Sequence, residues 1–268
     1  MPVAKLKRIR ELPTIPDVLK KLFEVIQDEE STFHDIAEVI SHDPSITERI
    51  LRIANASYFG HSGKVKTIEQ AVMLLGMELV KGIALGAVAF NVGDEKARAV
   101  LRNLWKHSCE VAVIAARLFK HISHEDVPAA FVSGLLHDIG RIAILTVEDN
   151  GYIEMLSRGC YLEDEVQAFG IGHEEAGQVF LRDAKLPEEL KTSVSSHHSA
   201  LTELDVFPRT VALSEALSAK LFPKPECDGR WDEGLWEYLN PYGLDPDSLE
   251  EFGLVCRKDA DFFDTLFG

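Results

Sequence analysis

An all-α fold is the class that this sequence predicts, and two observations support the prediction. Apolar residues recur at spacings of three and four in the long segments, which is the period of an amphipathic helix. Alternation of apolar and polar residues, which marks a half-buried strand, is found nowhere convincingly. The 268 residues are 46% apolar and 27% charged, an ordinary globular composition with enough apolar side chains for a large core. We therefore expect a bundle of many helices.

The N-terminal helices are marked by apolar faces and by start signals. Residues 16–28 form the first expected helix, and its apolar face carries Leu19, Leu22, Phe23 and Ile26. Ser31 is expected to cap a second helix, which carries Ile36, Val39 and Ile40. Asp43 followed by Pro44 predicts the start of a third helix, which carries Ile46, Ile50, Leu51 and Ile53. Thr67 and Gln70 resemble a capping box, so another helix is expected to follow them.

An almost continuous apolar run extends from Ala71 to Phe90. Glu78 and Lys81 interrupt it, so it predicts a buried helix rather than a membrane span. A helix that is apolar well beyond one face must be covered on several sides. Two coverings remain open from the sequence: the second half of this chain, or another chain.

The second half of the chain begins where the helical pattern breaks, near residues 92–94. An amphipathic segment is expected from about Ala97 to Lys120, and further helices are expected at 126–138, 163–168, 173–183, 187–197 and 208–221. Two prolines beyond Phe222 mark a linker. Three units are therefore predicted: an N-terminal helical subdomain over residues 1–96, a second helical unit over 97–222, and an acidic C-terminal extension over 223–268.

Charge and cysteine content exclude several classes of function. The net charge is −16, and residues 226–268 contain 12 acidic but only 3 basic residues, so this extension is expected to be a solvated acidic tail. Direct binding to nucleic acid or to an anionic membrane is not expected of so acidic a chain. The four cysteines are widely spaced, which favours a reducing compartment. No apolar segment follows the basic N-terminus, so no signal peptide is expected and the cytoplasm is the predicted location.

Histidines are the candidates for chemistry. Five of the ten lie in the second unit beside polar residues: His107, His137, His173, His197 and His198. His137 and Asp138 end an apolar helix in the stretch Leu-Leu-His-Asp-Ile-Gly-Arg, residues 135–141. Imidazole and carboxylate groups that project together from a helix end suit Fe, Mn, Zn or Ni.

Taken together, these residues exceed the four ligands of a structural zinc site. They suffice for two metal ions about 3.5–4 Å apart with Asp138 between them, which is the geometry of two-metal phosphoester hydrolysis. Each residue alone also has a plainer interpretation. Asp138 can cap a helix or pair with Arg141, His107 can be a hydrogen-bonded core residue, and His197 and His198 can lie exposed at a helix end. The joint pattern favours the metal site.

In these residues the sequence resembles the HD superfamily of metal-dependent phosphohydrolases, in which a His…His-Asp…Asp pattern binds metal. The order also resembles the two-metal subset, in which three further histidines hold a second ion. A glutamate, Glu215, stands where the family has its late aspartate. The ligands that the resemblance implies are His107, His137, Asp138, His173, His197, His198 and Glu215. In an enzyme, the resemblance further implies that Asp138 positions a metal-bound water and that Arg141 binds phosphate.

The N-terminal unit narrows the resemblance. Four stretches are similar to the HDOD domain, an HD-related output module of bacterial signalling proteins: Leu12–Pro16, His42–Pro44, Leu51–Ala56 and Ile68–Gly76. The similarity covers about residues 10–222 and implies an HD-like helical bundle. Most of that family looks degenerate at the metal positions and is regarded as regulatory, whereas this sequence keeps nearly all of the ligands. Cyclic di-GMP phosphodiesterase relatives have a Gly-Tyr-Pro loop after the paired histidines, whereas this chain continues Ser-Ala-Leu-Thr-Glu-Leu-Asp.

Two functions follow from these expectations, the first of them favoured, and a purely structural scaffold is the third alternative. The first is a regulatory module of bacterial signal transduction that binds one or two divalent transition-metal ions and acts through a signalling protein partner or a nucleotide ligand. The second is a metal-dependent phosphohydrolase acting on a nucleotide or a cyclic dinucleotide. The ligand set favours the enzyme, while the missing glycine-rich loop and Glu215 favour regulation. In the N-terminal unit, Asn55 has either a functional role or, as the favoured interpretation, a backbone hydrogen bond at a helix end.

Overall fold

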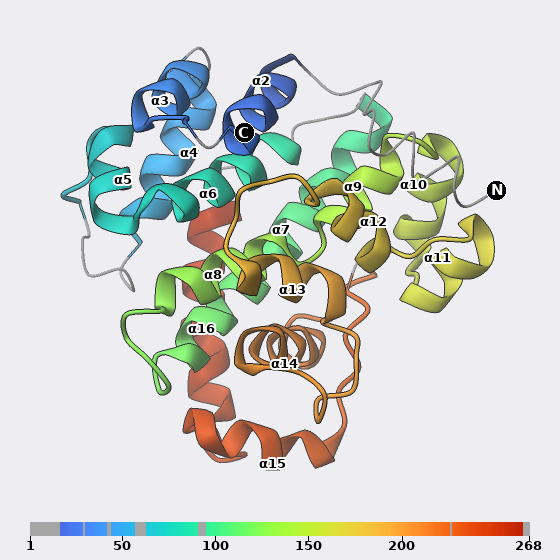
Figure 1. The fold of residues 1–268 in the computed structure, drawn as a ribbon. Coiled ribbons are helices and arrows are strands. Elements are labelled where there is room, and N and C mark those ends of the chain that lie inside the picture. Colours follow the sequence, from blue (N-terminus) through green and yellow to red (C-terminus); the bar gives the residue numbers. More distant parts are fainter. Residues whose placement is uncertain are drawn as a thin grey trace.

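The computed structural model describes residues 17–28, 30–41, 44–56, 63–90, 95–225 and 227–264. The regular elements in these ranges are all helices, and no strand occurs among them, which confirms the all-α prediction (Figure 1). The N-terminal helices are α2 (Asp17–Gln27), α3 (Phe33–Ser41), α4 (Pro44–Ala54), α5 (Ile68–Leu75) and α6 (Met77–Ala89). The middle of the chain forms α7 (Glu95–Phe119), α8 (Val127–Leu136), α9 (Ile139–Leu145), α10 (Asp149–Arg158), α11 (Leu162–Phe169), α12 (His173–Phe180), α13 (Glu188–Ser196) and α14 (Val206–Leu221). The C-terminal elements are η2 (Glu233–Leu235), α15 (Trp236–Leu239), η3 (Asn240–Tyr242) and α16 (Leu249–Asp264).

The helix starts follow local hydrogen bonding, with one correction to the prediction. Ser31 is not the cap of α3, because its hydroxyl donates to the Val25 carbonyl at 2.6 Å. Thr32 caps this helix instead. Its hydroxyl accepts from the Asp35 backbone N–H at 3.4 Å, and the Asp35 carboxylate accepts from the Thr32 N–H at 2.7 Å. Helix α4 begins at Pro44 as predicted, whereas the capping role of Asp43 lies outside the described residues.

The apolar run from Ala71 to Phe90 is two helices rather than one. Thr67 caps the first of them, α5, by accepting from the Gln70 N–H at 3.2 Å. Gly76 then ends α5 with φ +88°, a left-handed backbone angle that glycine adopts without strain. The chain resumes immediately as α6. Sequence period alone missed this break because both helices are apolar on either side of the glycine.

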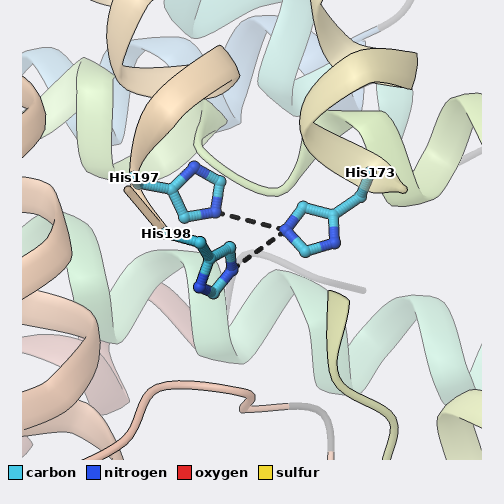
Figure 2. A group of neighbouring side chains, drawn as sticks. All are labelled: His173, His197 and His198. Atoms are coloured by element: carbon cyan, nitrogen blue, oxygen red, sulfur yellow. Dashed lines mark hydrogen bonds between the residues drawn. The ribbon is translucent and has the colours of Figure 1, made fainter. Parts of the chain in front are cut away.

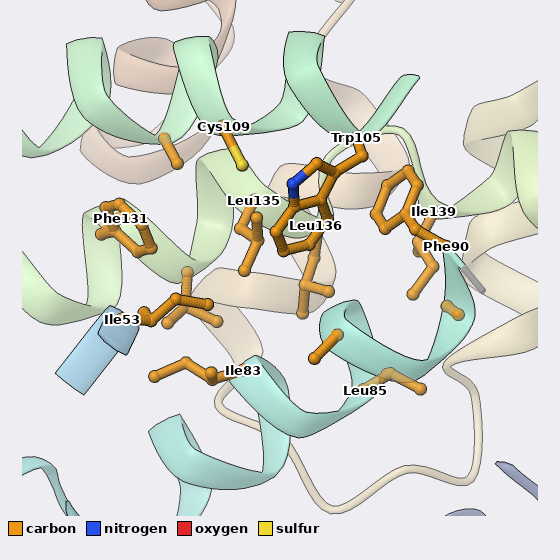
Figure 3. Close-up of a cluster of buried hydrophobic side chains, with 14 of the residues drawn as sticks. Ile53, Ile83, Leu85, Phe90, Trp105, Cys109, Phe131, Leu135, Leu136 and Ile139 are labelled. Atoms are coloured by element: carbon orange, nitrogen blue, oxygen red, sulfur yellow. The ribbon is translucent and has the colours of Figure 1, made fainter. Parts of the chain in front are cut away.

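Helix α6 lies between the N-terminal helices and the second half of the chain. Its residues from Val80 to Ala89 are all buried. A Cβ atom built on Gly82 would lie 2.7 Å from a Val132 methyl of α8, so the two helices approach closely through this glycine. The second half of the same chain therefore covers α6, a point that the sequence did not decide. The buried cluster in Figure 3 joins residues of both halves, among them Ile83, Phe90, Trp105, Phe131 and Leu136.

Helices α9 and α10 are absent from the predicted elements. The predicted helix 126–138 ends as α8 at Leu136, and after a turn at His137 and Asp138 the chain continues as α9. Among the described residues, one stretch is long and apolar enough to cross a membrane, Val127–Leu145, and 89% of its most apolar window is buried inside the protein. A segment that is buried to this extent inside the protein is typical of a helical core.

The C-terminal extension is packed against the bundle, so its prediction as a solvated tail is wrong. Leu239 and Phe263 are fully buried, and the ring centroids of Phe263 and Phe131 are 5.4 Å apart. The Trp105 indole N–H of α7 donates to the Phe263 carbonyl at 3.3 Å. Helix α16 thus runs along α7 (Figure 1). Its acidic residues lie mostly on the exposed face, which is why the charge count suggested a tail.

Candidate metal centre

All seven predicted ligands converge on one buried centre. Their positions come from five elements: α7, the turn between α8 and α9, the first residue of α12, the end of α13, and α14. Six of the seven are at most 2% exposed, and only His198 faces solvent in part, with its side chain 18% exposed. The residues brought together are His107, His137, Asp138, His173, His197, His198 and Glu215. Their role as metal ligands stays a prediction that this geometry supports.

The first cluster joins His107, His137, Asp138 and Glu215. The Nε2 atoms of His107 and His137 lie 3.8 and 3.6 Å from Asp138 Oδ2, and His107 Nε2 lies 3.8 Å from Glu215 Oε1. Ligand atoms on one ion are about 3.0–3.4 Å apart when each bond is about 2.1 Å. The cluster is therefore slightly wider than a loaded site. The longer glutamate side chain does reach the centre.

The second cluster joins His173, His197 and His198 (Figure 2). The His173 Nε2 atom lies 3.3 Å from His197 Nε2 and 3.1 Å from His198 Nε2. Asp138 Oδ1 is 3.4 Å from His173 Nε2 and 3.9 Å from His197 Nε2. Since Asp138 directs Oδ2 to the first cluster and Oδ1 to this one, its carboxylate lies between the two.

Backbone and carboxylate partners orient the rings. The Nδ1 atoms of His137 and His197 lie 2.7 and 2.9 Å from the Gly134 and Ser193 carbonyls. A carbonyl only accepts, so Nδ1 carries the proton in both. Burial lowers the pKa of both histidines, which keeps the rings neutral and leaves a lone pair on Nε2. Metal-bound histidines are oriented by this kind of partner.

Glu165 orients the ring of His173, and the sequence did not predict this role. Its Oε2 lies 2.7 Å from His173 Nδ1 and accepts the His173 backbone N–H at 2.7 Å. Burial alone would lower the pKa of His173, but the Glu165 carboxylate outweighs burial and raises that pKa to about 9. Tyr152 donates its hydroxyl to the other Glu165 oxygen at 2.6 Å. No motif in the sequence pointed to Glu165.

Several donor atoms of the centre have no hydrogen-bond partner within the described ranges. Among them are both ring nitrogens of His107, His137 Nε2, Glu215 Oε1 and both carboxylate oxygens of Asp138. Burial, followed by the nearby carboxylates of Asp228 and Asp138, raises the pKa of Glu215. Unpartnered buried imidazole and carboxylate atoms cost free energy unless a cation or an ordered water binds them. Nitrogen and oxygen donors in this mixture suit a divalent transition metal, so the residues fit such an ion.

Arg141 lies inside the centre beside three carboxylates. Its guanidinium nitrogens are 2.9 Å from Asp138, 2.7 Å from Asp228 and 3.5 Å from Glu165. Burial would raise the pKa of Asp138, but the Arg141 cation holds that pKa well below its usual range. The side chain of Arg141 is fully buried. Binding of phosphate by this guanidinium therefore stays a prediction that would require these ion pairs to open.

Gly140 explains the glycine of the Leu-Leu-His-Asp-Ile-Gly-Arg stretch. A Cβ atom built there would lie 1.8 Å from the His173 carbonyl oxygen and 2.6 Å from the Gly177 nitrogen. These are backbone atoms, which cannot move aside as the end of a flexible side chain can, so a Cβ atom would clash with them. The glycine therefore sets the distance between α9 and α12, and with it the place of His173.

The substitution Gly140→Ala is expected to move α12 away and to lower the free energy of unfolding by about 1–3 kcal/mol or more, because it overpacks a backbone contact. Urea unfolding of the metal-free protein measures this loss. Gly151→Ala is the matched control, since a Cβ atom at Gly151 in α10 meets nothing within 4 Å. That control is expected to be neutral or to stabilise by up to ~1 kcal/mol. Equal stability of Gly140→Ala and the unsubstituted protein would contradict the explanation.

Residues outside the centre take the plainer interpretation. The Asn55 amide donates to the Leu51 and Val65 carbonyls at 2.8 and 2.7 Å, and its oxygen accepts the Val65 N–H at 3.0 Å. The backbone interpretation of Asn55 is thus confirmed. The exposed histidines are His34, His121 and His124, while His42 and His61 lie outside the described residues.

A cavity of about 230 Å³ opens beside the centre. Its walls include His198, Glu215, Tyr161, Asp228 and Arg230. It reaches His197 and His198, the second of which is the one predicted ligand that is partly exposed. Three carboxylates line it in all, the third from Glu163.

Solved structures show the same fold. Two Shewanella amazonensis SB2B proteins align with 99% of this chain at a TM-score of 0.66. One is named as a candidate phosphohydrolase; it is 23% identical, and the alignment covers 98% of its chain. The other is named as a candidate metal-dependent phosphohydrolase; it is 20% identical, and the alignment covers 97% of its chain. A candidate signal transduction protein from Marinobacter aquaeolei VT8 has a TM-score of 0.64 and 17% identity, over 98% of this chain and 64% of that one. At these identities the likeness shows the fold alone.

Sequence comparison adds the family. An uncharacterized protein of Treponema pallidum (strain Nichols) is 24% identical over 206 residues, which is 72% of this chain and 38% of that protein. The protein YuxH of Bacillus subtilis (strain 168) is 25% identical over 168 residues, 63% of this chain and 39% of that one. The chain thus spans less than two fifths of the length of these curated relatives. The family model of the HDOD domain matches residues 12–200, and the chain therefore belongs to the HDOD domain family.

Proposed function

We propose that this chain is a regulatory module of bacterial signal transduction that holds one or two divalent transition-metal ions at the histidine–carboxylate centre. The observation that carries the proposal is the convergence of seven ligand side chains, Asp138 among them, of which six are buried and several have unpartnered atoms. Residues His107, His137 and Glu215 would hold one ion, and the remaining three histidines the other. Iron, manganese, zinc and nickel suit these donors.

Regulation is favoured over hydrolysis by the surroundings of the centre. A catalytic metal site keeps an open coordination position and a route for its substrate. Here the arginines at and beside the cavity are already paired with carboxylates, Arg230 with Glu163 and the buried Arg141 with Asp138 and Asp228. The module would pass its signal to a protein partner or respond to a nucleotide ligand.

Hydrolysis of a nucleotide or a cyclic dinucleotide is the second candidate function. One observation favours it: the cavity reaches His198 and Glu215, so a small molecule there would lie against the centre. A bound metal pair would supply a Lewis acid and an activated water. Asp138 would orient that water, and Arg230 is the cation at the cavity wall that could meet a phosphate.

The metal content per chain tests the proposal. Protein purified without an affinity metal and kept anaerobic is expected to contain up to two transition-metal ions per chain by elemental analysis, because two clusters share Asp138. No metal in folded protein, with no uptake of added iron or manganese, would refute it. Metal-dependent cleavage of nucleotides or cyclic dinucleotides by the loaded protein would instead establish the second candidate.

A further inference from the structure

Asp228 belongs to the C-terminal extension, outside the residues that the HDOD family model matches. Its side chain is nevertheless buried in the centre, with the residue 3% exposed. Its Oδ2 atom lies 2.7 Å from an Arg141 nitrogen and 3.3 Å from His198 Nε2. Burial would raise the pKa of Asp228, but Arg141 and His198 outweigh it and hold that pKa well below the usual range. The extension thus brings a carboxylate into a site built by other helices.

Contacts on both sides hold Asp228 in place. Before it, Lys224 forms an ion pair with Glu110 of α7, whose carboxylate is largely buried. After it, Gly229 lies against α14, where a Cβ atom would be 2.5 Å from the Glu215 carbonyl oxygen. Only a glycine allows the chain to pass this close to the helix that carries Glu215. The path of the chain therefore aims Asp228 at the histidines.

The position of Asp228 matches that of a ligand of the second cluster. Oxygen or nitrogen atoms of Asp228, Asp138 and His173 all lie within 4.8 Å of one another. The 3.3 Å between Asp228 Oδ2 and His198 Nε2 equals the separation of His173 and His197 Nε2 atoms within that cluster. It also falls within the ~3.0–3.4 Å expected between two ligands of one ion with bonds of about 2.1 Å.

We propose that Asp228 is a further metal ligand, which the C-terminal extension supplies to the ion held by His173, His197 and His198. This inference rests on the proposed function, because it requires that the centre binds metal. By linkage, docking of the extension and binding of the ion strengthen each other to the same extent. Asp228 also takes a coordination position that a substrate or water would need, which agrees with a regulatory rather than a catalytic site.

The substitution Asp228→Asn tests whether Asp228 is a metal ligand. Manganese or iron is the probe, and competition with a chelator measures the affinity. Affinity for the ion at His173, His197 and His198 is expected to fall at least on the order of 10- to 100-fold, the loss that removal of a group supporting a metal ligand already causes. Asp261→Asn is the matched control, because it makes the same change on an exposed face of α16. It is expected to bind both ions as the unsubstituted protein does. Unchanged affinity in Asp228→Asn would overturn the proposal.

Hydrogen exchange of the unsubstituted protein tests the linkage without any variant. Backbone amides of residues 227–235 are expected to exchange more slowly in loaded protein than in chelator-treated protein. Equal exchange in both states would overturn the coupling of the extension to the ion. Failure of the proposed function has a different signature, since the unsubstituted protein would then take up no metal in either experiment.

Discussion

Asp138→Asn is expected to empty both metal clusters together. The two carboxylate oxygens of Asp138 face different clusters, Oδ2 toward His107 and His137 and Oδ1 toward His173. An amide keeps the volume but loses the charge that both ions would share. We expect metal affinity to fall on the order of 100-fold or more, at or beyond the upper end of the losses seen for supporting groups. Elemental analysis and chelator competition measure it.

The fold of this variant should survive, because Arg141 retains Asp228 and Glu165 as partners. Circular dichroism would establish that. Asp126→Asn is the control: this exposed aspartate lies just before the other end of α8 and has no side-chain capping bond. Folded Asp138→Asn protein that keeps its full metal complement would show that Asp138 is a structural partner of Arg141 rather than a shared ligand.

Arg141→Met is expected to destabilise the metal-free protein by about 3–5 kcal/mol, because removal of one partner of a buried ion pair leaves uncompensated charge. The three buried carboxylates of Asp138, Glu165 and Asp228 would then lose their guanidinium partner. Methionine fills much of the volume, so the loss reports charge rather than a cavity. Urea unfolding in the presence of a chelator measures it.

The loss should depend on pH with a definite sign. Arg141 depresses the pKa of Asp138 in the folded state, so its contribution to stability is present above the unfolded pKa and disappears as the pH falls. The difference between Arg141→Met and the unsubstituted protein should therefore shrink on acidification. Arg158→Met, which removes an exposed ion pair with Glu154, is the control and should cost less than ~1 kcal/mol at any pH. A similar small loss for Arg141→Met would contradict the buried-charge argument.

The sequence was a good guide where information is local. The helical period and capping residues predicted α2, α4, α7 and α11 to α14 within a few residues. Cap placement failed at Ser31, where two neighbouring hydroxyls compete and only the hydrogen bonds decide between them. The five histidines and Asp138 were found from their order along the chain and from the adjacent pair His137 and Asp138, whereas Glu215 was predicted only through the resemblance to the HD superfamily.

What the sequence by itself determined is thus the all-α class and, with the family resemblance for Glu215, the seven residues that meet in the centre, Asp138 among them. Tertiary structure alone decided that α6 is covered by α8, that Glu165 orients His173, and that Asp228 enters the centre. Asp228 is one of 12 acidic residues in residues 226–268, and nothing local distinguishes it from the others. Its place depends on long-range packing, because the ion pair of Lys224 with Glu110 of α7 and the close passage of Gly229 along α14 set the path of the chain.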